Sequence, residues 1–115
     1  MALHSSLQQI GLTSGIVLAQ SAPTLATDGF DTRGERFCNV NVVLTAGTSC
    51  DVQIYLYNGA SWMLYTDVPT TTVTAANGGG LLQLEIRGQP RIAVRVTNLV
   101  GAGATANVFL TGVTY

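Results

Sequence analysis

The amino-acid sequence predicts a single all-β domain, an antiparallel β-sandwich or jelly-roll-like fold of about eight short strands with an N-terminal arm. Apolar and polar residues alternate along most of the chain, and glycine-rich turns separate the alternating segments. A chain of 115 residues has room for one hydrophobic core. We expect residues 1–30 to form the arm and a first strand, and residues 31–115 to form the sandwich.

The N-terminal region combines a polar segment, a short apolar run and a loop. Residues 1–14 are polar and mixed, as expected of an arm. The segment Ile16–Gln20 is predicted to be a strand that ends before Pro23. Thr27–Glu35 contains two glycines and four charged residues, which predicts a turn-rich loop.

Two central segments have a clear period of two, which is typical of half-buried strands. They are Cys38–Leu44 and Cys50–Tyr57. We expect the core to contain the even-numbered residues of both segments: Cys38, Val40, Val42, Leu44, Cys50, Val52, Ile54 and Leu56.

The dipeptide Asn58-Gly59 predicts a β-hairpin after the second of these strands. A four-residue loop would pair Tyr57 with Trp62, and a two-residue turn would pair Tyr57 with Ala60. Both alternatives place the same four side chains on one face: Tyr55, Tyr57, Trp62 and Leu64. A three-residue loop with a bulge would reverse this assignment.

Four further strands are expected, separated by turns at residues 77–80, 88–90 and 101–103. The strands are Thr70–Ala75, Leu82–Arg87, Ile92–Thr97 and Ala106–Thr111. In the last three, every second residue is apolar, so one face of each strand is expected to be buried.

The composition argues against two classes of partner. Charged residues make up 10% of the chain, against roughly 25% in an average soluble domain. A surface with so little charge is rich in uncharged polar groups or is covered by partners, and the sequence favours both. A net charge of −1 without a basic cluster does not suit nucleic acid. No run of about 20 apolar residues predicts a membrane span.

The residues that usually carry catalysis or bind metals are few. His4 is the only histidine and lies in the expected arm, whereas a catalytic triad needs a histidine held by the scaffold. One histidine and two cysteines cannot supply the four ligands of a zinc site. Cys38 and Cys50 fall on inward-facing positions, where we expect free thiols, with a buried disulfide as the alternative.

The acidic residues Asp28, Asp31 and Glu35 crowd one loop, an arrangement that raises the question of a calcium site. Their spacing does not match an EF-hand loop, and Arg33 and Arg36 lie among them. Ion pairs and turn capping explain these acids better. The sequence therefore predicts no enzyme, no metal and no cofactor.

Three aromatic residues, Tyr55, Tyr57 and Trp62, form the most distinctive constellation. Tyrosine and tryptophan on a sheet can anchor a protein interface or stack on a glycan. Alternatively, they form a second layer of the core, or cross-strand pairs that stabilise the hairpin.

Three arginines, Arg87, Arg91 and Arg95, form a second candidate for a protein interface. With Glu85 they alternate outward on two strands joined by Gly88-Gln89-Pro90, where opposite charges on neighbouring strands would stabilise pairing. All five basic residues are arginines, and arginine suits interfaces better than lysine does. A compositional bias of the genome explains the same fact.

Several features together resemble the small virion proteins of tailed bacteriophages, above all the head decoration (cement) proteins. They are the polar arm, the Asp31-Thr32-Arg33-Gly34 turn before a valine-rich strand, the Tyr-Asn-Gly-Ala-Ser-Trp hairpin at residues 57–62, short strands rich in threonine and glycine, and the low charge.

The resemblance implies a jelly-roll-like sandwich that forms homotrimers at three-fold positions of a phage head. The arm would reach over neighbouring major capsid protein subunits and stabilise the shell without chemistry. The chain would be found in the virion, after assembly in the host cytoplasm. The alternatives are a tail, collar or fibre component, and a glycan-binding module that uses Tyr55, Tyr57 and Trp62.

Overall fold

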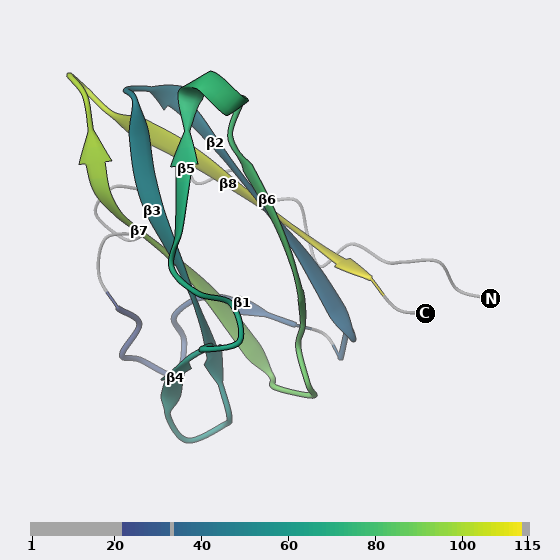
Figure 1. The fold of residues 1–115 in the computed structure, drawn as a ribbon. Coiled ribbons are helices and arrows are strands. Elements are labelled where there is room, and N and C mark those ends of the chain that lie inside the picture. The colour runs from purple at the N-terminus through teal and green to yellow at the C-terminus, as the bar shows by residue number, and fades with distance from the viewer. Residues whose placement is uncertain (1–21, 33, 114–115) are drawn as a thin grey trace.

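The structure, a computed structural model, describes residues 22–32 and 34–113 (Figure 1). These residues form eight β-strands and one short 3-10 helix, with no α-helix among them. The elements are β1 (Phe30–Asp31), β2 (Phe37–Ala46), β3 (Ser49–Tyr57), β4 (Trp62–Leu64), β5 (Thr71–Thr74), η1 (Ala75–Asn77), β6 (Gly80–Glu85), β7 (Arg91–Val100) and β8 (Thr105–Val113).

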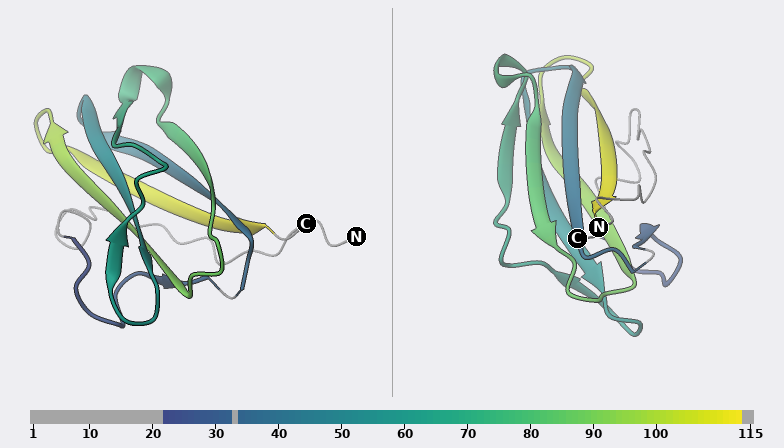
Figure 2. Two further views of the ribbon diagram at one scale, coloured as in Figure 1. Left: turned by 60° about the horizontal axis from the view of Figure 1, so that its bottom comes forward. Right: turned by 90° about the vertical axis from the view of Figure 1, so that its right-hand side faces the viewer.

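The strands form two antiparallel sheets that pack face to face as a sandwich (Figure 2). The larger sheet has the order β1-β7-β3-β4, with β5 also paired to β3, and the smaller sheet has the order β6-β2-β8. The all-β sandwich predicted from the sequence is therefore confirmed. Strand β1 was not predicted, and the strand expected at Ile16–Gln20 lies outside the described residues.

At one end of the molecule, three pairs of consecutive strands cross from one sheet to the other: β2–β3, β5–β6 and β7–β8. Each pair is an arch that gives one strand to each sheet, and β2–β3 is the middle arch. The three crossing turns lie side by side at the same end of the molecule, the top of Figure 1. Thr48 joins them, because its N–H donates to the Val100 carbonyl (2.7 Å) and its carbonyl accepts from the Ala75 N–H (2.9 Å).

The core lies between the sheets and contains the alternating residues that the sequence predicts. The predicted even-numbered residues of β2 and β3 are buried, with Leu44 partly buried, whereas Ala46 at the end of β2 is exposed. The other strands and Ile86, which follows β6, contribute further buried side chains: Val73, Leu84, Ile86, Ile92, Val94, Val96, Ala106, Val108 and Leu110. Local periodicity thus identified the buried face of each long strand.

Both cysteines are buried and neither forms a disulfide, as expected. Cys38 lies at the start of β2 and Cys50 near the start of β3, just after the turn that joins the two strands. Measured along β2, the two cysteines are therefore about seven residues apart, which is roughly 23 Å. A disulfide requires Cα atoms within about 7 Å. The alternative of a buried disulfide is therefore excluded in this fold.

The connection Gly88-Gln89-Pro90 differs from the expected hairpin. It joins β6 in the smaller sheet to β7 in the larger sheet, so the two strands are not neighbours. The prediction of cross-strand pairing between Glu85 or Arg87 and Arg95 is wrong for this reason. The connection is held by Thr32, whose Oγ1 donates to the carbonyls of Gln89 (2.7 Å) and Pro90 (3.1 Å).

Candidate functional site

The hairpin between β3 and β4 places the aromatic residues on the outer face of the larger sheet. Tyr57 pairs with Trp62 and Tyr55 with Leu64, which is the register of the four-residue loop. Asn58 fixes the loop, because its Oδ1 accepts from the N–H groups of Ala60 and Ser61, both at 2.8 Å. The predicted grouping of the four side chains is confirmed.

Trp62 contacts the chain that precedes β1. Its ring centroid lies 5.1 Å from that of Tyr57, with a 43° angle between the planes. Its Nε1 donates to the Leu25 carbonyl at 2.8 Å. A Cβ atom placed on Gly29 would lie 3.0 Å from the far edge of the indole, so the two are in close contact. The indole is therefore wedged between Tyr57 and residues 24–29, here called the docked segment.

Arg91 holds the same docked segment from β7. Its Nε donates to the Asp28 carbonyl (2.8 Å), and its Nη2 donates to the carbonyls of Thr27 (3.1 Å) and Gly29 (2.9 Å). The planar guanidinium suits this fork of three acceptors. Arg91 is the register partner of Tyr57, so the two contacts to the segment lie side by side.

The carboxylate of Asp28 closes the docked segment into a turn. Its Oδ2 accepts from the N–H groups of Leu25 and Thr24, both at 2.8 Å. These two bonds, with a smaller effect of Arg91, lower the pKa of Asp28 below its ordinary value. The prediction that the acids of this loop cap turns is confirmed for Asp28.

Arg95 lies further along the outer face of β7, in a row of polar groups. Its Nη1 donates to Gln53 Oε1 (3.3 Å) and approaches the Tyr55 hydroxyl (3.5 Å). Gln53 in turn donates to the Thr70 hydroxyl (3.1 Å). The row crosses β7 and β3 and ends at Thr70, just before β5.

Asp51 forms a second polar bridge near the crossing turns. Its Oδ2 accepts from Asn98 Nδ2 (3.0 Å) and its Oδ1 accepts from the Thr72 hydroxyl (2.8 Å). These bonds lower the pKa of Asp51. Asn98 has a positive φ of 55° where the register between β3 and β7 shifts, so Asp51 supports a bulge in β7.

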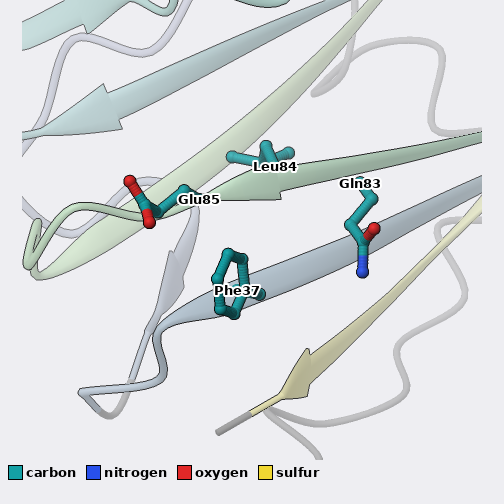
Figure 3. Close-up of a pocket in the computed structure, with 4 residues that line it drawn as sticks. All are labelled: Phe37, Gln83, Leu84 and Glu85. Atoms are coloured by element: carbon teal, nitrogen blue, oxygen red, sulfur yellow. The ribbon is translucent and has the colours of Figure 1, made fainter. Parts of the chain in front are cut away.

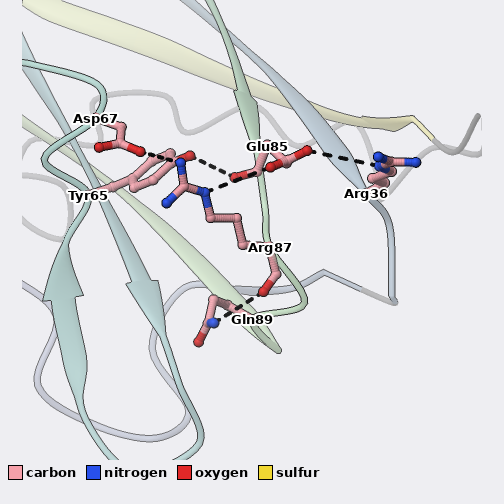
Figure 4. Close-up of polar contacts among 6 residues, drawn as sticks. All are labelled: Arg36, Tyr65, Asp67, Glu85, Arg87 and Gln89. Atoms are coloured by element: carbon pink, nitrogen blue, oxygen red, sulfur yellow. Dashed lines mark hydrogen bonds and ion pairs between the residues drawn. The ribbon is translucent and has the colours of Figure 1, made fainter.

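Arg87 lies apart from the other two candidate arginines, at the lower rim of the sandwich (Figure 4). It pairs with Asp67, lies 3.8 Å from Glu85 Oε1, and its guanidinium carbon is 5.6 Å from the centroid of the Tyr65 ring. Arg36 approaches Glu85 from the other side at 4.0 Å. Arg87 is thus part of an ion-pair cluster at the rim, and the three candidate arginines do not form one row.

None of the candidate interface residues from the sequence lies on the outer face of the smaller sheet. Its rows include Leu81–Asn41–Phe109, Gln83–Asn39 and Val43–Asn107. At the outward positions of β2, β6 and β8, Glu85 is the only charged residue in the sequence. We call this surface the amide face, after its central residues: Phe37, Asn39, Asn41, Val43, Leu81, Gln83, Asn107 and Phe109.

A shallow hollow of about 330 Å³ lies at the lower end of the amide face (Figure 3). It is lined by Phe37, Gln83, Leu84 and Glu85. The amide face was missed because alternation identifies outward positions without showing whether polar residues there are charged. Counting charges by strand face, rather than along the whole chain, would have found it.

The described residues bring together no group of three or more histidine, cysteine or acidic side chains that could hold a metal ion. Burial, and to a smaller extent Asp51, raises the pKa of the Cys50 thiol, so its reactive thiolate is disfavoured. His4 lies outside the described part of the chain. Within that part, no helix has the length and apolar character needed to cross a bilayer.

Comparisons of the chain with protein-family models, curated proteins and solved structures gave no match.

Proposed function

We propose that this chain is a structural protein of a bacteriophage virion, a head decoration protein that binds and stabilises the assembled shell. The observation that carries the proposal is the amide face, an outward sheet surface with one charged residue at its end and with Leu81, on the edge strand β6, 70% exposed in its middle row. Depletion of charge with exposed apolar groups is typical of the central part of a protein interface. The sequence resemblance to decoration proteins supplies the kind of assembly.

In this proposal the chain acts by binding, without catalysis or a cofactor. A protein that binds the assembled shell and not its separate subunits stabilises the shell by mass action. Its partners are the major capsid protein or other virion subunits, and copies of the chain itself in a homo-oligomer. A homotrimer is the form that the resemblance implies.

Co-sedimentation with purified shells of the virus whose genome carries the chain tests the proposal. We expect the chain to pellet with assembled shells at a saturating ratio and to raise the temperature at which they rupture. The matched control is the soluble, unassembled shell subunit, which is not expected to retain the chain. A chain that stays in the supernatant with intact shells contradicts the proposal.

A glycan-binding module is the second candidate, favoured by the Tyr57–Trp62 ring pair on the outer face of the larger sheet. The Trp62 indole is already oriented by its bond to Leu25, and a fixed aromatic ring suits stacking on a sugar. Binding on a glycan array that is lost in Trp62→Ala, with the fold retained by circular dichroism, would favour this function. A tail, collar or fibre position is distinguished by fractionating virions.

A further inference from the structure

The polar groups of the amide face are self-complementary. Asn39, Asn41, Gln83 and Asn107 each carry a donor and an acceptor, so an amide can pair with an identical amide. Where two copies meet about a two-fold axis, a charged group near the axis faces its own copy and is repelled by it. The apolar members of the face can pack against their own copies without any such restriction.

The opposite outer face lacks this property. Asp51, Arg91 and Arg95 lie on it, and a two-fold contact centred on any of them would bring like charges close together. Arg91 is also committed to the docked segment. Of the two outer faces, the amide face is the better surface for a second copy of the chain.

The two edges of the smaller sheet differ in the same way. The β6 edge ends in Glu85, which pairs with Arg36 and Arg87, and charged groups discourage strand pairing at an edge. The β8 edge runs for nine residues with neither a charged residue nor a proline. Among the described strands, only β2 pairs with β8. In the described part of the chain, the amide face is therefore bordered by an edge whose own residues carry neither a charge nor a proline against strand pairing.

We infer that the amide face, with the adjoining β8 edge, is the contact between copies of this chain. The inference rests on the proposed self-association of the chain and adds the surface, with a two-fold pairing of copies in place of the three-fold one that the resemblance implies. From the spacing of strands and residues, the face measures roughly 20 by 15 Å, smaller than about 800 Å² per partner in a standard interface. Association of the free chain is therefore reversible and depends on concentration.

Analytical ultracentrifugation of the full chain over a dilution series tests the inference. Leu81→Lys replaces the most exposed apolar side chain of the amide face with a cation and raises the dissociation constant by about tenfold or more, because the contact would bury a charge. Leu64→Lys is the matched control, since Leu64 is 44% exposed on the opposite outer face. It leaves the dissociation constant unchanged. Equal effects of both variants overturn the inference.

Asn41→Asp gives a second test with little change of shape. Asn41 is exposed in the middle row of the face, so each copy gains a carboxylate there. Association is lost at neutral pH and recovers below about pH 4, where carboxylates are protonated. An associating variant at neutral pH contradicts the inference.

A wild-type chain that stays monomeric at every concentration but pellets with shells assigns the amide face to another partner. That result overturns the inference and leaves the proposed function standing. A chain that self-associates but does not pellet with shells contradicts the proposed function and leaves the inferred contact between copies standing.

Discussion

Arg91 and Trp62 are residues whose type suggested an interface with another molecule, and the structure uses both within the chain. Arg91 donates to three carbonyls of the docked segment, and Trp62 donates to a fourth. Contacts between positions 37 to 64 residues apart leave no local signal in a sequence. Tyr55 and Arg95 also contact each other on the outer face. The Arg95 Nη1 lies 3.5 Å from the Tyr55 hydroxyl, at the limit of hydrogen-bond distance.

Replacing Arg91 with lysine tests this role. Lysine keeps the charge but cannot reproduce the planar fork, so we expect a loss of about 1–2 kcal/mol in the free energy of unfolding. Amide hydrogen exchange in the docked segment should become faster. Arg36→Lys, at an exposed ion pair, is the control and should change stability by less than about 0.5 kcal/mol. Unchanged exchange in the docked segment would show that Arg91 does not hold it.

Asp51 gives a prediction about pH. Its folded-state pKa lies below the unfolded value of about 3.9, so its contribution to stability is present above that pH. The contribution is lost as the pH falls through the lowered pKa. Asp51→Ala should therefore lower the free energy of unfolding at pH 7 by no more than about 1 kcal/mol, and the difference from wild type should shrink below about pH 4.

An NMR titration of the Asp51 carboxyl carbon measures the cause directly. In Asn98→Ala the largest stabilising bond of the carboxylate is removed, so the pKa of Asp51 should rise toward its ordinary value. Identical titration curves in the two proteins would mean that Asn98 does not stabilise the charged form.

At the scale of elements, the three arches depend on close contact between their crossing turns. Gly101 has a φ of 111°, and a Cβ placed there would lie 2.9 Å from the Gly47 Cα and 3.0 Å from the Thr48 nitrogen. A side chain at this position is therefore both strained and too close to the backbone of the middle arch.

We expect Gly101→Ala to cost about 2–4 kcal/mol in the free energy of unfolding, measured by chemical denaturation. Gly103→Ala is the matched control in the same turn. Gly103 also has a positive φ, 63°, but nothing lies within 4 Å of its Cβ position, so strain alone should cost about 1 kcal/mol. Equal losses in the two variants would exclude close packing of the turns as the reason.

The sequence predicted the elements better than their pairing. Alternation identified the buried face of β2, β3, β7 and β8, and Asn58-Gly59 located the hairpin. It could not show that Gly88-Gln89-Pro90 crosses between sheets, because a turn residue specifies a change of direction and not the partner strand. Strand β1 was missed because a two-residue strand has no period.

For the whole molecule, the two outer faces have different uses. The outer face of the larger sheet is bridged by polar contacts and carries the docked segment, whereas the amide face has almost no charge. The sequence predicted the aromatic grouping on the first face but not the second face as a candidate. A pairing of strands that are distant in sequence, β6 with β2 and β2 with β8, creates the amide face.

The molar mass of the purified wild-type chain, measured by light scattering at increasing concentration, tests most directly whether copies of this chain associate with one another. We expect a mass that rises from 12.0 kDa toward an integral multiple of it and returns on dilution. A mass that stays at 12.0 kDa up to the solubility limit would contradict this expectation.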